Sequence, residues 1–592
     1  MQTSDWLVER LVSWGVTRIF GYSGDGINGV LGALQRLEGT SKAIEFVQVR
    51  HEEMAAFMAT AHAKFTGELG VCLSTGGPGA THLLTGLYDA KLDHAPVLAI
   101  TGQAETTVRG AHYQQEMNLD RLFADVAVFV QEAVSPAQVR HLVDRGIRMA
   151  IAERGVSVLV LPKDVQDEEW KEPEHAHGFT QSGPGYSWPK IVPHAADLKR
   201  AADILNAGAR VAILVGAGAR GAAPEVVDAA DALGAGVAKA LLGKDVLPDD
   251  LPFVTGAIGL LGTKPSYRMM RECDTLLMIG TSFPWSEFLP ADGRARAVQI
   301  DIDAGMLGLR YPVEANLHGD AADTLRALLP LLDPKQDREW RRSIEDDVMA
   351  WWQTVEKRAM TPAHPVNPQR VVWEMSARLP PDALLAADSG TSAPWYAECF
   401  RLRQGQRGSL SGGLASMGAA VPYAIAAKFA NPTRPVVALV GDGAMQMSNM
   451  AELITVQKYW RRWKDPRFVV CVLNNEDLNE VTWEQRVMQG NPRYEATQAL
   501  PDVHYAKFAD MIGLRGIYVD TPEGLGGAWE TALQAERPVV IEVKTDPEVA
   551  PLPPHLTLTQ TKAFLSAYAK GDRRSAQALR HGIRQAMQKN SS

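Results

Sequence analysis

The sequence predicts an α/β protein of three consecutive domains, each with a parallel sheet flanked by helices. Strand-like apolar runs alternate with helical patterns in three successive blocks of the 592 residues. A stretch rich in Pro, Gly and His, EPEHAHGFTQSGPGYSWPKIVP, separates the first block from the second. Several apolar runs end in Gly, Asp or Asn, as expected of strands whose carboxyl ends carry a ligand site. We expect domains at residues 1–175, 190–335 and 360–547 and a C-terminal tail at residues 548–592.

Composition and charge indicate a globular protein and argue against a nucleic-acid binder. Apolar residues make up 46% of the chain and charged residues 22%, which are ordinary values. The net charge is −9 and the body of the chain has no long basic tract. No apolar run approaches the length of a membrane span, and the N-terminal region lacks the apolar stretch of a signal peptide. The four scattered cysteines are typical of a reducing compartment, so we expect a cytoplasmic protein.

The third block contains an apolar run that ends in Gly441-Asp442-Gly443 and leads into a helical pattern. A strand that ends at a glycine turn presents backbone N–H groups and a helix N-terminus, which favour an anion. Because the Asp442 carboxylate would repel a phosphate, we interpret it as a ligand of Mg²⁺ or Ca²⁺ that bridges to a phosphorylated cofactor. The alternative is a plain strand-to-helix turn with Asp442 as the N-cap.

A second apolar run, residues 468–473, ends in two amides, Asn474 and Asn475. Amide oxygens suit hard cations. The stretch between Gly443 and Asn474 has room for one helix and one strand. Parallel neighbouring strands would then bring both polar tips to the same edge of a sheet, where ligands of α/β proteins gather.

These two motifs resemble the signature of thiamine diphosphate (ThDP) enzymes, a GDG triplet followed by a spacer and NN. The resemblance is closest to pyruvate oxidases and acetolactate synthases and extends over residues 3–560. It implies the ThDP-enzyme architecture of pyrimidine-binding, central and diphosphate-binding domains. After NN the chain departs from the family, with Glu476 and Leu478 around Asp477 in place of a glycine and an aromatic residue. The implied Mg²⁺ ligands are the side chains of Asp442 and Asn475 and the backbone carbonyl of Asp477, with cofactor contacts at Gly441, Gly443 and Ala444.

ThDP becomes reactive only when a carboxyl group in an apolar pocket is hydrogen-bonded to its aminopyrimidine ring. The stretch VQVRHEEMAAFMATAHAKFTG, residues 47–67, offers a carboxyl at the start of a helix rich in Ala and Met. The resemblance selects the glutamate that follows His51, which is Glu52 rather than Glu53. The alternative is that both are ordinary first-turn carboxylates favoured by the helix dipole.

Further segments resemble parts of the cofactor pocket. The loop at residues 75–79, TGGPG, is tight enough to admit a ring or a phosphate close to its backbone, so we expect contacts at Gly77 and Pro78. His82 resembles a histidine that faces the reaction centre, and the alternative is a satisfied structural histidine. In the segment SGGLASMGAAVPYAIAA, the resemblance places Met417 beneath the two rings and the Ala415 carbonyl at the amino group; a core methionine is the alternative.

Residues 109–130 resemble the corresponding segment of the oxidases, with Gln115 at the catalytic centre. The usual Phe-Gln-Glu of the family is here Gln114-Gln115-Glu116. Losing the phenylalanine removes an apolar wall beside the reaction centre. This indicates a larger or more polar substrate than pyruvate, or altered electron transfer.

The central block carries candidate contacts for FAD. The run ARVAILVGAGARGAA places Gly216 and Gly218 after a strand, and two further strands end at Gly280 and Asp301. A short GxG is a weak signal alone, but a carboxylate at a strand tip can bind ribose hydroxyls. These stretches resemble the FAD segments of pyruvate oxidase and acetolactate synthase, while relatives without FAD keep a degenerate version. We expect FAD to be bound.

The resemblance therefore implies ThDP- and Mg²⁺-dependent decarboxylation of a pyruvate-like 2-oxo acid, followed by oxidation through FAD. Three alternatives stay open: an acetolactate synthase-like carboligase, a non-oxidative 2-oxo acid decarboxylase and a non-catalytic binding protein with the ThDP fold. We expect a homodimer or homotetramer, because similar enzymes place each cofactor between domains of two chains. We expect a small-molecule 2-oxo acid as the substrate and, from the net charge, no nucleic-acid partner.

The end of the tail is predicted to form a basic amphipathic helix. After Gly571, the residues Leu579, Ile583 and Met587 recur at helical spacing on one face, and basic side chains cover the rest. Such a helix can lie on an anionic membrane surface, as in quinone-reducing pyruvate oxidases, which this tail resembles. The alternative is a helix that packs on the body or frays in solvent. Peripheral contact with the inner face of a membrane is expected only through this tail.

Overall fold

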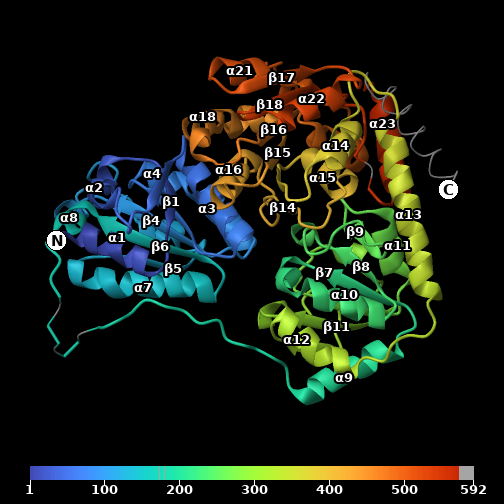
Figure 1. Cartoon of the computed structure of the whole chain (residues 1–592), viewed down its shortest axis with the longest axis horizontal. Coiled ribbons are helices and arrows are strands. Elements are labelled where there is room, and N and C mark those ends of the chain that lie inside the picture. Colours follow the sequence, from blue (N-terminus) through green and yellow to red (C-terminus); the bar gives the residue numbers. More distant parts are fainter. Residues whose placement is uncertain (173, 176, 179, 552, 556, 573–592) are drawn as a thin grey trace. The chain divides into compact units, whose positions relative to one another are not determined.

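The computed structural model describes residues 1–572 except residues 173, 176, 179, 552 and 556. Three six-stranded sheets follow one another along the chain, each flanked by helices (Figure 1). This arrangement confirms the predicted α/β fold class. The domain boundaries expected from the sequence stay predictions, and the helix predicted around Leu579, Ile583 and Met587 lies outside the described residues.

The described chain divides into two compact units. One unit consists of residues 1–188, 409–438 and 444–468. The other consists of residues 189–408, residues 439–443 and the chain from residue 469 onward.

The first sheet consists of β1 (Arg18–Gly21), β2 (Glu45–Gln48), β3 (Gly70–Ser74), β4 (Val97–Gln103), β5 (Ala127–Glu132) and β6 (Val156–Pro162). The strands are parallel, in the order β2-β1-β3-β4-β6-β5. The inner strands β4 and β6 are buried along their whole length, in agreement with their largely apolar sequences. Because the chain runs from β1 outward to β2 and returns to β3 on the other side, the switch point lies between the ends of β1 and β3.

Helix α3 (Glu52–Thr66), in the first unit, is buried along almost its whole length. It packs against α5 (Leu84–Leu92) and α16 (Ala420–Ala430). A helix rich in Ala and Met on all sides is suited to such burial, because small side chains let neighbouring helices approach closely. The helix ends at Gly67, which has the left-handed φ of 79° that a C-terminal cap requires. The other helices of this unit are α1 (Thr3–Ser13), α2 (Asn28–Leu37), α4 (Pro78–His82), α6 (Leu119–Phe123), α7 (Pro136–Ala152), α8 (Lys163–Asp167) and α18 (Met450–Tyr459).

The second sheet consists of β7 (Val211–Val215), β8 (Gly236–Lys239), β9 (Val254–Ala257), β10 (Thr275–Ile279), β11 (Arg296–Asp301) and β12 (Ala315–His318). The strands are parallel in the order β12-β11-β10-β7-β8-β9, and apolar clusters cover both faces. The switch point lies between the ends of β7 and β10. The helices of this part are α9 (Ala195–Ala207), α10 (Ala223–Ala232), α11 (Lys264–Glu272), α12 (Ala321–Leu328) and α13 (Glu339–Ala359).

The third sheet consists of β13 (Leu384–Ala387), β14 (Arg407–Ser409), β15 (Val436–Gly441), β16 (Phe468–Asn474), β17 (Arg515–Val519) and β18 (Val539–Lys544). Its order is β14-β13-β15-β16-β18-β17, so β15 and β16 are neighbours and the switch point lies between β13 and β15. The helices of this part are α14 (Pro368–Arg378), α15 (Ser392–Cys399), α17 (Asp442–Ala444), α19 (Asn479–Glu484), α20 (Glu495–Gln498), α21 (Tyr505–Met511), α22 (Gly524–Leu533) and α23 (Leu558–Ala569).

A buried cluster of charges fixes the end of the described chain. The Arg486 guanidinium, which is 0% exposed, pairs with Glu548 and Asp572 at 2.8 Å each. Helix α23 packs beside the turn that carries Arg486. Among residues 1–572 as described, no helix has both the length and the apolar character needed to cross a membrane.

Candidate functional site

The segments singled out in the sequence lie at the switch points of the three sheets. The glycine loop at residues 75–79 follows β3, Gly216 follows β7, Gly280 follows β10 and Asp442 follows β15. Open α/β sheets bind ligands at these positions, because the chain leaves adjacent strands in opposite directions and opens a crevice. The topology therefore provides three edges suited to small molecules.

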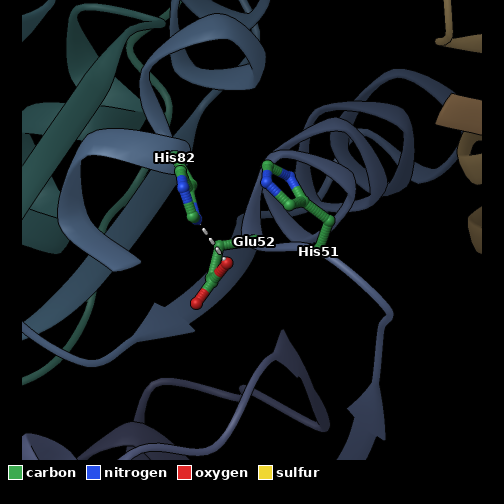
Figure 2. A group of neighbouring side chains, drawn as sticks. All are labelled: His51, Glu52 and His82. Atoms are coloured by element: carbon green, nitrogen blue, oxygen red, sulfur yellow. Dashed lines mark hydrogen bonds and ion pairs between the residues drawn. The ribbon is translucent and has the colours of Figure 1, made fainter. Parts of the chain in front are cut away.

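Glu52 occupies the first position of α3, where its side chain is buried. The residue is 7% exposed, and its Oε2 lies 2.9 Å from Nδ1 of His82 (Figure 2). His51, the N-cap of α3, accepts the backbone N–H of Glu53 through Nδ1. The rings of His51 and His82 have centroids 4.3 Å apart. A buried carboxylate beside an imidazole can hold or release a proton away from bulk water, as an acid–base group must.

The glycine loop after β3 permits a close approach to this carboxylate. A Cβ on Gly79 would lie 3.2 Å from Oε1 of Glu52, so a larger residue would press on the carboxylate. Gly77 has φ 57° and a Cβ there would lie 2.7 Å from Cβ of Gln115, so both the turn and the contact require glycine. The structure thus brings together the predicted residues Glu52, Gly77, Pro78, His82 and Gln115.

The loop that carries Gln115 has a strained backbone. Gln115 and His112 have φ values of 64° and 56°, in a region that side-chain-bearing residues rarely adopt. The carboxylate of Glu116 closes the loop by accepting the N–H groups of Gly110 at 2.5 Å and Tyr113 at 3.1 Å. A cavity of about 300 Å³ lies against this loop. Strained residues beside a cavity are typical of a ligand site.

Asp442 joins the tips of β15 and β16, as the motif spacing predicts. Its Oδ1 accepts the N–H of Gly443 at 2.9 Å, and its Oδ2 accepts the N–H groups of Asn475 at 3.0 Å and Glu476 at 2.6 Å. The residue is 2% exposed. Burial raises the pKa of Asp442 to about 7 against the opposing effect of these N–H groups. A divalent cation would offset the buried negative charge, so the carboxylate fits the role of a metal ligand.

The neighbouring donors fit a hard cation as well. Oδ1 of Asn475 accepts the N–H of Asp477 at 3.0 Å, which fixes the amide oxygen beside the turn. The Asp477 carboxylate is held by Nε of Arg493 at 2.7 Å and Nδ2 of Asn479 at 2.9 Å. The Asp477 carboxylate is thus bound by other side chains, so the oxygen that Asp477 would offer to a cation is its backbone carbonyl. Carboxylate, amide and carbonyl oxygens together form the donor set that Mg²⁺ and Ca²⁺ use.

The remaining predicted contacts are divided between the two units. Ala415, Met417 and Ala444 belong to the first unit, and Gly441 and Gly443 accompany Asp442 in the second. Ala415 has φ 55°, a left-handed conformation that costs free energy for any residue with a Cβ. The segment around it is therefore held in its shape by contacts with other parts of the unit.

Glu452 is a buried carboxyl group that was not predicted from the sequence as a functional residue. It is 0% exposed on α18, and its Oε1 accepts the N–H of Arg50 at 2.7 Å, two residues before Glu52. Burial raises the pKa of Glu452 to about 7. This contact fixes the loop that leads into α3. Its signal in the sequence was weak, because Glu452 is one of several polar residues in a mixed helix.

The candidate flavin residues meet at the switch point of the second sheet. The N–H of Gly218 donates to the carbonyl of Gly280 at 3.0 Å, and a Cβ on Gly216 would lie 2.3 Å from the same oxygen. The two turns thus pack directly on each other, which by itself requires glycine at these positions. Asp301 ends β11, and its Oδ1 accepts the N–H of Asp303 at 3.0 Å. The glycines at this switch point are therefore explained without a bound dinucleotide.

Comparison with known proteins gives matches along most of the chain. The models described as the thiamine pyrophosphate enzyme N-terminal TPP binding domain, central domain and C-terminal TPP binding domain match residues 1–122, 198–328 and 388–543. A putative thiamine pyrophosphate-containing protein of Bacillus subtilis, YdaP, is 40% identical over 559 residues, which cover 94% of each chain.

Two other relatives have names that state an activity. A pyruvate oxidase of Lactiplantibacillus plantarum is 31% identical over 540 residues, covering 90% of this chain and 87% of the relative. A probable acetolactate synthase large subunit of Methanocaldococcus jannaschii is 30% identical over 579 residues, covering 94% of each.

Proposed function

The chain belongs to the family of thiamine pyrophosphate enzymes, and from this premise we propose that it oxidatively decarboxylates a pyruvate-like 2-oxo acid with ThDP, Mg²⁺ and FAD. The observation that carries the proposal is the contact between the buried Glu52 carboxylate and the exposed His82 ring beside a glycine loop. Bound ThDP supplies the nucleophilic carbon and the electron sink that decarboxylation needs, and FAD accepts the two electrons.

Glu52 has the central acid–base role in this proposal. Its carboxyl would hydrogen-bond to the aminopyrimidine and hold or release the proton on which the reactivity of the cofactor depends. His82, at 2.9 Å, orients that carboxyl and faces the reacting substrate. Gln115, beside Gly77, is the polar residue that the family usually has at this position, whereas Gln114 stands where the family usually has an apolar phenylalanine.

The tips of β15 and β16 would hold the diphosphate through Mg²⁺. Asp442, the Asn475 amide and the Asp477 carbonyl provide the oxygen ligands, and Gly441, Gly443 and Ala444 allow close approach of the backbone. The Ala415 carbonyl and the Met417 side chain would support the rings. Gly216, Gly218, Gly280 and Asp301 would hold the flavin nucleotide.

Carboligation of the acetolactate synthase type is the second candidate. The observation in its favour is the 30% identity to a probable acetolactate synthase large subunit over 579 residues, which cover 94% of this chain. The segment at residues 109–130, which resembles that of the oxidases, favours the oxidase. A relative of each kind covers most of the chain.

The visible spectrum of the purified protein distinguishes these candidates. The oxidase predicts flavin absorption that bleaches when pyruvate is added without oxygen, because the substrate electrons reduce the flavin. A flavin that stays oxidised while acetolactate forms would establish the carboligase. Release of CO₂ and free aldehyde without either change would establish simple decarboxylation.

We also infer a homo-oligomer, because Glu52 and Asp442 belong to different compact units and family members are expected to bind each cofactor between two chains. Sedimentation at working concentration should show a dimer or tetramer. A fully active monomer would contradict this inference.

Weak membrane contact through the tail is a separate proposal. Co-sedimentation with vesicles of anionic lipid should be reduced in a chain that ends at Gly571. Equal binding by the two chains would contradict a role of the tail.

A further inference from the structure

Asp93 is a buried carboxylate that follows α5 and reaches a distant loop. Its side chain is 0% exposed. It accepts the N–H groups of Gly412 at 3.0 Å and Gly413 at 2.5 Å, and it forms a buried ion pair with Lys64. A charged acceptor that binds two consecutive N–H groups fixes the direction of both peptide units. Asp93 thus anchors the start of the segment that contains Ala415 and Met417.

Lys64 extends this anchor to three other elements of the same unit. It lies in the last turn of α3, and its Nζ donates to the carbonyl of Leu410 and to Oη of Tyr423, each at 2.8 Å. Tyr423, on α16, donates in turn to the buried carboxylate of Asp89 on α5. The lysine is only 4% exposed, so the ion pair with Asp93 offsets the cost of burying its charge.

The loop itself is shaped to meet the anchor. A Cβ on Gly413 would lie 2.8 Å from Cβ and 2.9 Å from the carbonyl oxygen of Leu92, so only glycine lets the loop reach Asp93. Further along, Oγ of Ser411 accepts the N–H of Ser416 at 2.9 Å, which closes the loop around Ala415. The left-handed φ of 55° at Ala415 is unfavourable for a free chain, so the loop needs such anchors to keep its shape.

We propose that Asp93, held by Lys64, is a positioning residue that keeps the loop from Gly412 to Met417 in the shape that receives the ring end of ThDP. The inference rests on the proposed function, which gives Ala415 and Met417 their contacts with the rings. A loop that is already ordered pays less conformational entropy when the cofactor binds. Loss of the anchor therefore weakens ThDP binding more than it slows the reaction of bound ThDP.

Two variants test the anchor in different ways. Asp93→Asn removes the charge that binds both N–H groups and Lys64. Gly413→Ala keeps all buried charges and instead pushes the loop away from Leu92, at an exposed position where the core is undisturbed. The matched control is Asp125→Asn, which breaks the exposed ion pair between Asp125 and Lys91. Lys91 lies on α5, the helix that Asp93 directly follows. The second variant keeps the test decisive if Asp93→Asn does not fold.

The measurement is calorimetric binding of ThDP in the presence of Mg²⁺, with inorganic diphosphate and Mg²⁺ as the second probe. We expect both variants to raise the dissociation constant of ThDP about tenfold to a hundredfold, the range for a lost hydrogen bond to a charged group. The affinity for diphosphate, which lacks the rings, should stay within about twofold of wild type. The apparent KM for ThDP should rise by more than kcat falls, and the control should behave as wild type.

Unchanged ThDP affinity in Gly413→Ala, with a folded protein, would overturn the proposal. A parallel loss of ThDP and diphosphate binding would also overturn it, because it would indicate general disruption of the protein. Wild-type protein that binds no ThDP would refute the proposed function instead.

Discussion

Replacing Glu52 by glutamine isolates the proton-holding role of its carboxyl group. Glutamine keeps the length and shape of the side chain, so it fits against Gly79 and His82 as glutamate does. The amide has no proton to exchange at neutral pH. At 7% exposure the site gives water little access to take over the role. We therefore expect the full loss typical of a removed acid–base group, about 10²- to 10⁴-fold in kcat.

This loss corresponds to about 3–5 kcal/mol of transition-state stabilisation. ThDP binding should change little, because in the proposed function the metal and the loop from Gly412 to Met417 hold the cofactor. The assay is the initial rate of CO₂ release from pyruvate at saturating ThDP and Mg²⁺, with binding measured by calorimetry on the same samples.

The adjacent Glu53 provides a matched control. Burial raises its pKa, and it faces His51 and Thr85. Glu53→Gln therefore should keep a rate within a few-fold of wild type. The reasoning is refuted if Glu52→Gln retains activity within a few-fold, or if Glu53→Gln loses as much as Glu52→Gln.

Three further variants test the metal site, the buried ion pairs and a buried proton. Asp442→Ala should abolish ThDP binding in Mg²⁺, because the metal loses its charged ligand; unchanged affinity in calorimetry would contradict the assignment. Arg486→Met removes a fully buried cation that pairs with Glu548 and Asp572 and should cost about 3–5 kcal/mol in denaturant unfolding, whereas a cost under about 1 kcal/mol would contradict the role of this ion pair. The folded state raises the pKa of Glu452 from 4.5 to about 7, so stability falls as the pH rises between these values, where only the unfolded chain has lost the proton. Glu452→Gln should remove that part of the pH dependence of melting, and parallel profiles for variant and wild type would count against it.

The sequence could predict the fold and the sheet edges because these depend on local pattern. The apolar runs before Asp442 and Asn475 are strands with polar ends, and parallel neighbours must bring such ends to one edge. The structure shows them joined by the Asp442 carboxylate. The glycine loop at residues 75–79 was predicted only as a tight turn that admits a ligand, and the structure adds that Gly79 lies close to Glu52.

Contacts between residues far apart in the chain could not be predicted in this way. Asp93 binds Gly412 and Gly413, and Glu452 binds Arg50, with several hundred residues between the partners. Local periodicity describes one element and its own face, so it contains no information on which distant N–H group a buried carboxylate will reach.

The glycines of the candidate flavin segment show a different limit. A GxG turn has the same sequence whether glycine is needed for a ligand or for another turn. In the structure, the contact between Gly218 and Gly280 already accounts for it. The pattern at Gly216 and Gly218 correctly indicated a turn after a strand, and the predicted flavin contact stays a prediction.

The dependence of decarboxylation on both cofactors tests the central claim most directly. Protein stripped of cofactors should be assayed for CO₂ release from pyruvate and a panel of other 2-oxo acids, with ThDP and Mg²⁺ added singly and together. The account predicts release from at least one 2-oxo acid only when both are present. Release that needs neither cofactor, or no release from any 2-oxo acid by protein shown to bind both, would contradict it.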